Sequence, residues 1–402
     1  MRDEMKKVPR LRFRGFQEDW ELCKLSTEFE KVNERNDGSL GKEHWISVAK
    51  MYFQNPDKVQ SNNIDTRTYV MRTGDIAFEG HPNKEFKFGR FVANDIGTGV
   101  VSELFPIYRH KQEYDNYYWK NAIQIERVMG PIFAKSITSS GNSSNKLDPN
   151  HFLRQQVFIP KLEEQSKIGL FLKKIDTTIA LHQRKLDQLK ELKKAYLQVM
   201  FPVKDERVPK LRLADFEGEW EQCKFFDMWE KSSDRNKELK YSSKDVLSVA
   251  KMTKNPVERN SSDEYMKTYN ILHYGDIAFE GNKSKDYSFG RFVLNNLQDG
   301  IVSHVFIVFK PKVKMDIDFM KVYINNEYFM KHHLVKATTK TLMMTTLNVQ
   351  DMNKQKLRIP SLNEQERIGK FFKELDHAIT LHQNKLTQLN SLKKSYLQNM
   401  FI

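Results

Sequence analysis

Cysteine is scarce in this chain of 402 residues, which contains only Cys23 and Cys223. The two cysteines correspond to each other in an internal repeat, and each falls in a different half of the chain. A disulfide framework or a cysteine-based metal site is therefore not expected. We predict instead that both are small, half-buried side chains.

Long apolar runs are also missing. No stretch approaches the roughly 20 apolar residues that a membrane-spanning helix needs. The first residues, Met1–Lys7, are mostly charged and lack the apolar centre of a signal peptide. From these two absences we expect a cytoplasmic protein that does not contact a membrane.

Recognisable catalytic motifs are absent as well. The chain has no P-loop spacing and no His-Glu-x-x-His pattern. Gly97-Thr98-Gly99 stops short of a dinucleotide-binding pattern, and we interpret it as a hairpin turn. Asp75, Glu85 and Lys87 imitate the spacing of a metal-dependent nuclease, but the corresponding residues of the second half lack the lysine. We therefore expect a protein that is not an enzyme and holds no metal or cofactor.

Positive charge is in excess. Lysine and arginine number 66 and aspartate and glutamate 52, which gives a net charge of +14 and a pI near 9.4. A basic balance suggests a polyanionic partner, although on its own it is weak evidence. The length predicts two to three domains with ample buried core.

A stretch of 43 residues occurs twice. Residues 159–201 and 359–401 are identical at 26 of 43 positions when aligned without gaps. Each copy opens with Ile-Pro-x-Leu-x-Glu-Gln and closes with Tyr-Leu-Gln-x-Met-Phe. Apolar residues recur at alternating steps of four and three, which predicts a long helix in a coiled coil. Ser361 and Glu364 have the spacing of a capping box, which Lys161 removes from the first copy.

The predicted helix–helix seam is formed by equivalent positions of the two copies. Each copy has one histidine in the seam, which we interpret as a packed residue and not as a metal ligand. The seam residues are Ile168, Leu172, Ile175, Ile179, His182, Leu186, Leu189 and Tyr196 in the first helix and Ile368, Phe372, Leu375, Ile379, His382, Leu386, Leu389 and Tyr396 in the second.

A globular domain precedes each helix, and the two domains share short motifs. Gly-Asp-Ile-Ala-Phe-Glu-Gly occurs at 74–80 and 275–281, and Phe-Gly-Arg-Phe-Val at 88–92 and 289–293. The predicted boundaries are 1–160 for the first domain, 161–201 for its helix, 202–360 for the second domain and 361–402 for the last helix. In the first domain we expect a short helix after Thr27, helix within 114–129, and strands at 45–50, 66–71, 76–78, 88–92, 100–108 and 157–159.

The chain reads as a two-unit cycle. Val208-Pro209-Lys210 follows the first helix, and the equivalent Val8-Pro9-Arg10 stands near the start of the chain. Such a cycle closes only if the two helices run antiparallel, which we predict. A symmetric register would place His182 near His382, Leu189 near Leu375 and Tyr196 near Ile368, with the chain ends close together.

Cations and hydroxyl-bearing side chains in strands, turns and loops are the candidates for DNA contact. Cations neutralise phosphates, and Arg, Asn, Ser and Thr can also recognise base edges. The hydroxyl-rich segments 136–146 and 336–346 are expected to be loops. The candidates are Lys50, Arg67, Tyr69, Lys84, Lys87, Arg90, Thr138, Ser139, Asn142 and Asn145 in the first domain and Lys251, Lys267, Tyr269, Lys283, Lys285, Arg291, Thr338, Thr339 and Lys340 in the second.

The order of domain and Ile-Pro-x-Leu-x-Glu-Gln helix, repeated twice, resembles the specificity subunit of type I restriction-modification systems. The resemblance covers essentially the whole chain and rests on the two helices, the Gly-Asp-Ile segments and the segments before Trp20 and Trp220. It implies an α+β fold with two pseudo-repeated mixed α/β target-recognition domains separated by an antiparallel coiled coil of two long helices.

The same resemblance implies that each domain recognises one half of a bipartite asymmetric site in double-stranded DNA. Methyltransferase subunits, two of them, and restriction and translocase subunits would assemble on this chain, with S-adenosylmethionine bound by the methyltransferase. Two other classes stay open. A stand-alone DNA-binding or architectural protein would not copurify with a methyltransferase, and a coiled-coil scaffold would not bind DNA.

Overall fold

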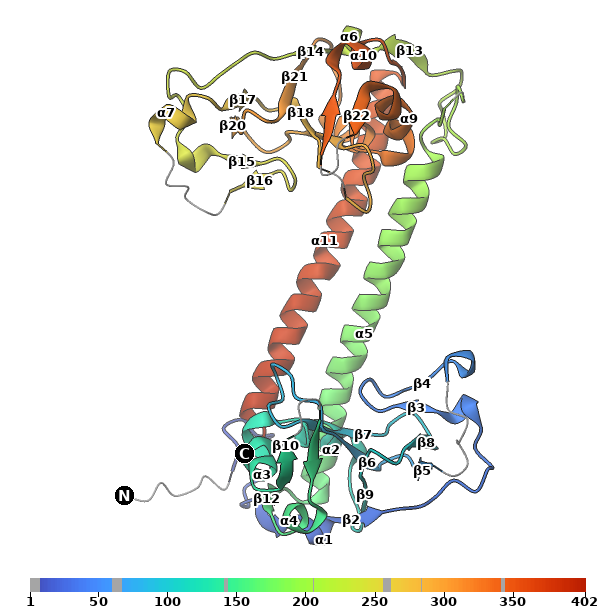
Figure 1. Ribbon diagram of the computed structural model, residues 1–402, viewed down its shortest axis with the longest axis vertical. Helices are drawn as coiled ribbons and strands as arrows, with labels where there is room; N and C mark the ends of the chain where they lie inside the picture. The colour runs from blue at the N-terminus through green and yellow to red at the C-terminus, as the bar shows by residue number, and fades with distance from the viewer. Residues whose placement is uncertain are drawn as a thin grey trace. The chain divides into compact units, whose positions relative to one another are not determined.

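The computed structural model describes residues 8–59, 67–140, 144–204, 206–255, 262–282, 284–340 and 344–402. The chain divides into two compact units, one formed by Met1–His182 with Lys385–Ile402 and the other by Gln183–Asn384 (Figure 1). Each unit therefore combines one domain with a part of both long helices.

The first domain is a mixed α+β domain. Its elements are β1 (Glu21–Lys24), α1 (Leu25–Glu28), β2 (Phe29–Val32), η1 (Lys42–His44), β3 (Ile46–Ser47), β4 (Tyr52–Phe53), η2 (Pro56–Lys58), β5 (Thr68–Met71), β6 (Ile76–Glu79), β7 (Arg90–Ala93), β8 (Gly99–Ser102), β9 (Ile107–His110), α2 (Asn116–Ala122), α3 (Glu126–Ala134), β10 (Ile137–Ser140), β11 (Asn145–Leu147), α4 (Pro149–Leu153) and β12 (Gln156–Ile159).

An antiparallel four-stranded sheet of order β2-β9-β6-β7 forms the centre of the first domain. Its strand β6 is apolar at every position but the last, and Ile76, Ala77 and Phe78 are buried. Strands β5 and β8 pair beside this sheet, and β1 pairs with β12, the strand that leads into the long helix.

The second domain repeats this plan. Its elements are β13 (Glu221–Lys224), α6 (Phe225–Met228), β14 (Trp229–Lys231), η3 (Ser243–Asp245), β15 (Leu247–Ser248), β16 (Thr253–Lys254), α7 (Asp263–Met266), β17 (Asn270–Leu272), β18 (Ile277–Glu280), β19 (Arg291–Leu294), β20 (Gly300–Val302), β21 (Ile307–Pro311), α8 (Ile317–Ile324), α9 (Glu327–Ala337), β22 (Thr338–Lys340), β23 (Thr345–Leu347), α10 (Val349–Asn353) and β24 (Lys356–Ile359). Its central sheet has the equivalent order β14-β21-β18-β19.

The long helices α5 (Leu162–Val199) and α11 (Leu362–Asn399) run antiparallel within each unit. In the first unit the rings of Phe171 and Tyr396 pack at a centroid distance of 4.8 Å. In the second unit the equivalent rings, Tyr196 and Phe371, pack at 4.9 Å. Lys393 pairs with Asp176 at 2.6 Å and Lys193 with Asp376 at 2.5 Å, again within single units. The predicted antiparallel direction is confirmed.

All the predicted seam positions are buried or half-buried, and the burial pattern of α5 recurs unchanged in α11. The predicted register is wrong by about one turn, because the aromatic partner of Tyr196 is Phe371, three residues beyond Ile368. The side chains of His182 and His382 are both half-buried, and their pairing stays a prediction.

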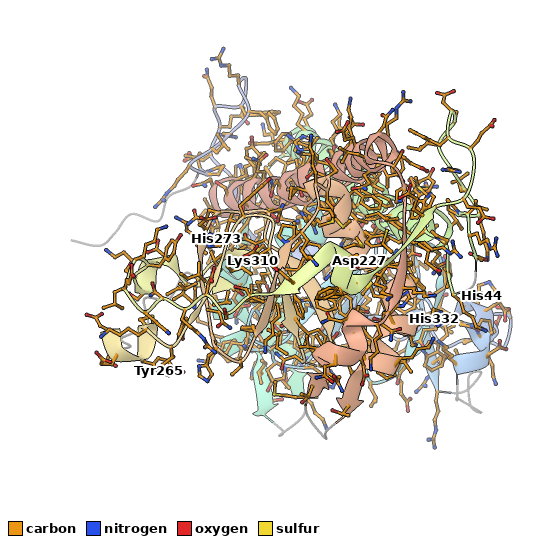
Figure 2. The ribbon with its side chains drawn as sticks, turned by 90° about the horizontal axis from the view of Figure 1, so that it is seen from above. His44, Asp227, Tyr265, His273, Lys310 and His332 are labelled. Atoms are coloured by element: carbon orange, nitrogen blue, oxygen red, sulfur yellow. The ribbon has the colours of Figure 1, made fainter. Side chains whose placement is uncertain are left out.

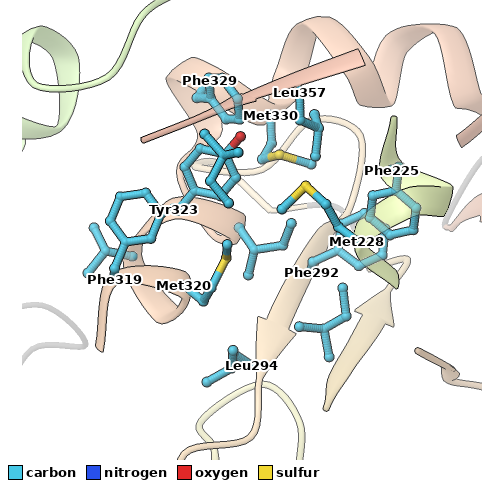
Figure 3. Packing of buried hydrophobic residues seen from close by; sticks show 14 of the residues in the cluster. Phe225, Met228, Phe292, Leu294, Phe319, Met320, Tyr323, Phe329, Met330 and Leu357 are labelled. Carbon is cyan, nitrogen blue, oxygen red and sulfur yellow. The ribbon is translucent and has the colours of Figure 1, made fainter. Parts of the chain in front are cut away.

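Each domain core receives the phenylalanine that follows the end of a long helix. In the second unit Phe201 packs against Trp220 and Phe319, with centroid distances of 6.2 and 6.1 Å. Phe319 also belongs to the cluster of aromatic and methionine side chains drawn in Figure 3. In the first unit Phe401 packs in the same way against Trp20, at 6.5 Å. The backbone N–H of Leu11 donates to Asn399 O as that of Leu211 donates to Val199 O, both at 2.9 Å, which supports the predicted cycle.

The Ile-Pro-x-Leu-x-Glu-Gln motif fastens each domain to its helix. Glu164 is almost fully buried and accepts two hydrogen bonds of 2.7 Å from Arg12. Gln165 donates to Pro160 O and accepts from the backbone N–H of Asp115, which caps α2. A Cβ at Gly169 would overlap that aspartate, so glycine is required where α2 meets α5. These contacts define the domain–helix joint.

The second joint has the same contacts. Glu364 accepts from Arg212 at 2.8 and 2.7 Å, and Gln365 bonds Pro360 O and the backbone of Asp316. The predicted capping box is therefore only half present. The Ser361 hydroxyl accepts from the backbone N–H of Glu364 at 3.4 Å, but the Glu364 carboxylate bonds the arginine.

Four local predictions were wrong. The helix expected after Thr27 is instead α1, which contains Thr27, and the residues that follow form strand β2. Segment 136–146 contains a β-hairpin, β10–β11, instead of a loop, and segment 336–346 contains the equivalent β22–β23. Residues 100–108 contribute to two strands, β8 and β9, because a turn at 103–106 divides them. Gly97–Gly99 is no hairpin turn, since β7 and β8 belong to different sheets. The cysteines are half-buried and free, as predicted.

Candidate nucleic-acid interface

Several of the predicted DNA-contacting residues of the first domain meet at one end of its central sheet. β6 ends at Glu79 beside the start of β7, and Phe78 bonds Pro106, next to the start of β9. We call this region the β6 end; it comprises turn 48–51, loop 80–89, turn 103–106, the start of β5 and the start of β11. The equivalent β18 end of the second domain comprises turn 249–252, loop 281–290, turn 303–306 and the start of β23.

Arg90 and Arg291 position the turns that present Lys50 and Lys251. The Arg90 guanidinium donates to Glu79 at 3.0 Å and to Ala49 O at 2.6 Å. Arg291 donates in the same way to Glu280 and to Ala250 O, at 2.7 and 2.8 Å. Lys50 and Lys251, which follow those alanines, are exposed. The two arginine side chains thus hold the turns in place, and the two lysine side chains are exposed to solvent.

A basic groove of about 610 Å³ lies in the second unit, beside the β18 end. Its lining joins the last turns of α5 to the domain and brings together the predicted residues Lys251, Lys285 and Arg291. The further cations that line it are Lys193, Lys194 and Lys321. Lys193 and Arg291 are neutralised by Asp376 and Glu280, whereas Lys251 and Lys285 are exposed side chains.

The remaining basic and aromatic candidates differ in accessibility. Lys84, Lys87 and Arg67 are exposed at the β6 end, and Lys267 pairs with Glu264 at 2.6 Å. Tyr69 is half-buried, and the Arg35 guanidinium lies over its ring, 4.6 Å from the ring centroid.

The prediction for Tyr269 was wrong. Its side chain is 0% exposed and belongs to a buried cluster with Val246, Met266 and Ile301. A side chain in this position cannot reach DNA in the folded domain.

The hydroxyl and amide candidates lie on the hairpins β10–β11 and β22–β23. Thr138 and Thr339 are exposed, whereas the Thr338 hydroxyl donates to Leu334 O at 2.6 Å. The backbone of Asn145 bonds Gly80 O at 2.8 Å, which places the hairpin at the β6 end. The side chains of Ser139 and Lys340, and residues Asn142 and Lys283, lie outside the described part of the structure.

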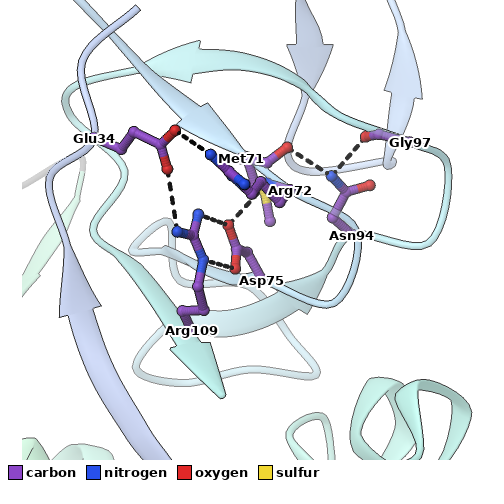
Figure 4. A network of polar contacts seen from close by, with 7 residues as sticks. All are labelled: Glu34, Met71, Arg72, Asp75, Asn94, Gly97 and Arg109. Atoms are coloured by element: carbon purple, nitrogen blue, oxygen red, sulfur yellow. Dashed lines mark hydrogen bonds and ion pairs between the residues drawn. The ribbon is translucent and has the colours of Figure 1, made fainter. Parts of the chain in front are cut away.

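A network of charged residues lies at the start of β6, the end of the strand opposite to Glu79 (Figure 4). Asp75, 1% exposed, accepts two hydrogen bonds of 2.8 Å from Arg109, which also donates to Glu34 at 3.1 Å. Arg72 donates to Glu34 at 2.7 Å. Hydrogen bonding to Asp75 raises the pKa of Arg109, and hydrogen bonding to Arg72 lowers the pKa of Glu34. Asp75 therefore holds Arg109 and the turn before β6 in place. This structural role fits the sequence analysis, which set the nuclease-like spacing of Asp75 aside.

The second domain replaces this network with weaker partners. Lys310, which stands in place of Arg109, and His273 are labelled in Figure 2. Lys310 pairs with Asp234 at 2.5 Å, while His273 contacts Asp299 at 3.0 Å. Asp276, the counterpart of Asp75, accepts the backbone N–H of His273 at 2.9 Å. Burial without an ion-pair partner raises the pKa of Asp276 to about 6.

Sequence reasoning missed the two joint arginines, Arg12 and Arg212. The available signal was their equal spacing of 152 residues from Glu164 and Glu364, which the repeat preserves. Among the described residues no cluster of His, Cys, Asp and Glu has the arrangement of a metal site. In the same part of the chain, no helix is both long and apolar enough to cross a membrane.

Comparison with known families assigns these domains. The model of the type I restriction modification DNA specificity domain matches residues 93–191 and 217–391, which include less than half of the first domain but most of the second domain and of both helices. The chain belongs to this family. A comparison with curated proteins found no match.

Solved structures share the specificity-subunit fold. The type I restriction-modification S subunit from M. genitalium aligns over 98% of this chain and 99% of its own, with 12% identity and a TM-score of 0.59. A structure described as the basis of complex assembly and conformational transition of the type I R-M system covers 95% and 97%, with 13% identity and a TM-score of 0.51. At these identities the likeness concerns the fold alone.

Proposed function

We propose that each domain recognises one half of a bipartite asymmetric DNA site, through its β6 or β18 end. The observation that carries this proposal is a common scaffold with unlike surfaces. Arg90 and Arg291 hold equivalent turns, while the loops and hairpins around them differ in sequence. The exposed lysines of these ends would contact phosphates, and the polar hairpin residues would recognise base edges.

The long helices are proposed to dock two methyltransferase subunits. Leu170, Leu181 and Leu192 are exposed by 54, 65 and 44% and recur every eleven residues, about three helical turns, so they share one face of α5. The second helix exposes Leu381 and Leu392, which are equivalent to Leu181 and Leu192. A repeated apolar face outside the seam is suited to two copies of one helical partner. Restriction and translocase subunits would join the same assembly.

Catalysis is assigned to those partners. Methyl transfer would require S-adenosylmethionine, which we place on the methyltransferase subunit, because the present chain offers no recognised motif for it. The purified chain alone should then neither methylate nor cleave DNA, and methylation should appear when the methyltransferase is added. Methyl transfer by a rigorously purified single chain would contradict this division.

Exchange of domains tests the split readout. Replacing residues 1–158 with the corresponding domain of a relative, in a host that also expresses the methyltransferase, should change one half of the methylated sequence. Replacing 205–358 should change the other half. Methylome sequencing gives the result, and a simultaneous change of both halves would rule out independent recognition. Inserting a seam-preserving segment in both helices should lengthen the unrecognised spacer.

A docking test uses the exposed leucines. Leu181→Asp combined with Leu381→Asp should prevent copurification of the methyltransferase while leaving DNA binding by the chain intact. Glu191→Gln, an exposed polar change on α5, is the control. Unchanged copurification of the double variant would place the methyltransferase elsewhere.

A further inference from the structure

One large apolar side chain stands alone at the β6 end. Leu104, in the turn between β8 and β9, is 83% exposed, the highest value among the exposed large hydrophobic residues of the described chain. The equivalent turn of the second domain carries Val305, which is 58% exposed. A single exposed leucine is ordinary, but an exposed aliphatic residue at the same turn of both domains requires an explanation.

The turn itself is a fixed part of the scaffold. Phe105 donates its backbone N–H to Ser102 O, and Phe306 donates to Ser303 O, both at 3.1 Å. Phe105 packs on the buried cluster beneath, which Val48 also joins. Only the two residues between this serine and phenylalanine differ, being Glu103-Leu104 in one domain and His304-Val305 in the other. The serine and the phenylalanine that support the turn are therefore the same in both domains, and only the two residues at its tip differ.

An arginine side chain lies near each tip. Arg67, an exposed residue, accepts the backbone N–H of Glu103 at 3.2 Å, and Arg35 pairs with the Glu103 carboxylate at 2.8 Å. In the second domain the ring of His304 lies edge-on to Tyr265 at 6.4 Å. Arg235 donates to Thr268 O near the same turn. An aliphatic tip with an arginine nearby suits a polyanion better than it suits an apolar protein surface.

We propose that Leu104 and Val305 are specificity-determining residues that contact the 5-methyl group of thymine in the major groove. An aliphatic side chain offers no donor or acceptor, and the thymine methyl is the apolar group that the major-groove edge of a base pair presents. Each tip would select A·T over G·C at one position of its half-site. This inference rests on the proposed function and adds the chemical identity of one contact in each domain.

The test combines a protein change with a DNA change. The probe is a duplex that contains the methylated sequence of the wild-type complex, with thymines of one half-site replaced singly by uracil, which removes only the methyl group. At one thymine, uracil should weaken binding of the chain–methyltransferase complex about fourfold, the effect of one buried methyl group. Leu104→Ala should weaken binding to the thymine duplex similarly, and the two losses should not add when combined.

Salt dependence separates this contact from a phosphate contact. Leu104→Ala should leave the slope of log K against log salt unchanged, whereas loss of a phosphate-binding cation changes it by about one. Leu22→Ala, another exposed leucine of the first domain, is the matched control and should bind as wild type. Val305→Ala should repeat the result in the other half-site.

Four outcomes would overturn the proposal: additive losses, an altered salt slope, a half-site made of G·C pairs only, or unstacking of 2-aminopurine beside the tip, which would indicate a wedge. If the wild-type complex bound the specific duplex and a scrambled duplex with equal affinity, the proposed function itself would be refuted. Thermal melts of each variant verify folding, which an exposed side chain should not affect.

Discussion

Asp75 and Asp276 occupy the same buried position in the two domains but have different partners. Asp75 is held by two hydrogen bonds from Arg109, while Lys310, the counterpart of Arg109, pairs with Asp234. One carboxylate is therefore neutralised by a half-buried arginine, and the other has its pKa raised to about 6 by burial. The shared fold tolerates exchange of this network because strand pairing and core packing hold the sheet on their own.

The domain–helix joint shows the opposite behaviour. Arg12 with Glu164 and Arg212 with Glu364 repeat the same pair at nearly the same distances. A carboxylate buried at the start of a helix requires both a cation and the helix dipole. The comparison teaches that the joint is the constant part of each repeat and that the charged networks of the domains can vary.

Breaking the joint should have the largest effect on stability. Arg12→Ala leaves the buried Glu164 carboxylate without its cation and should lower the unfolding free energy by about 3–4 kcal/mol. Arg212→Ala should cost about 1 kcal/mol less, because Trp220 Nε1 still donates to Glu364 at 3.3 Å. Urea unfolding followed by hydrogen exchange measures both. Glu18→Gln, which breaks an exposed ion pair with Lys161, is the control without a measurable effect. Equal losses in the two domains would contradict the role of the tryptophan.

The same substitution should have opposite signs at the two buried aspartates. Asp75→Asn removes the carboxylate that pairs with Arg109 and should destabilise the first domain by about 3 kcal/mol. Asp276→Asn should instead stabilise the second domain by about 1–2 kcal/mol at pH 7.5. Unfolding free energies of both variants, measured at that pH, decide the matter.

The pH dependence of the second domain gives a separate check. Because the folded chain holds the Asp276 proton more tightly than the unfolded chain does, this group lowers the unfolding free energy as the pH rises from about 4 to about 6. The raised pKa corresponds to at most about 3 kcal/mol. Asp276→Asn should flatten this pH window and match wild type near pH 4. A variant that keeps the wild-type pH profile would show that another group titrates there.

Removing single exposed lysines should weaken DNA binding moderately and alike in the two domains. If about six phosphates are neutralised, the slope of log K against log salt should be near −5, and Lys50→Ala or Lys251→Ala should each reduce its magnitude by about one. Lys24→Ala and Lys224→Ala, exposed equivalent residues of β1 and β13, should leave the slope unchanged. A wild-type slope near zero would remove the electrostatic basis of the interface.

Moving the chain ends should have the smallest effect. Leu11 bonds the end of α11 as Leu211 bonds the end of α5, so a linker from residue 402 to residue 1 with a new opening at 204–206 exchanges equivalent positions. The permuted chain should fold with nearly unchanged stability and keep its DNA specificity. Loss of folding with several linker lengths would show that the two repeats are not interchangeable.

Repetition made the long-range parts of the fold predictable. The seam positions, the antiparallel direction and the duplicate domains all follow from two copies of one pattern, which restrict the possible connections. The hairpins β10–β11 and β22–β23 were not predictable, because their polar residues are typical of loops and pair only where Gly80 and Gly281 bond the adjacent backbone. The burial of Tyr269 was equally hidden, since a tyrosine between polar neighbours in sequence gives no sign of the cluster that covers it.

The sequence by itself determined the two-repeat order, the length of the helices and the side of each helix that is buried, because helical periodicity and internal identity are local properties. The tertiary structure alone decided which charges are partners. Arg12 pairs with Glu164 across 152 residues, Arg90 donates to the Ala49 carbonyl, and Leu104 is exposed at the turn between β8 and β9. The sequence around a charged residue or an exposed leucine does not indicate which residue will lie beside it. That neighbour is distant in sequence and comes close only when the strands pair and the domain packs against its helix.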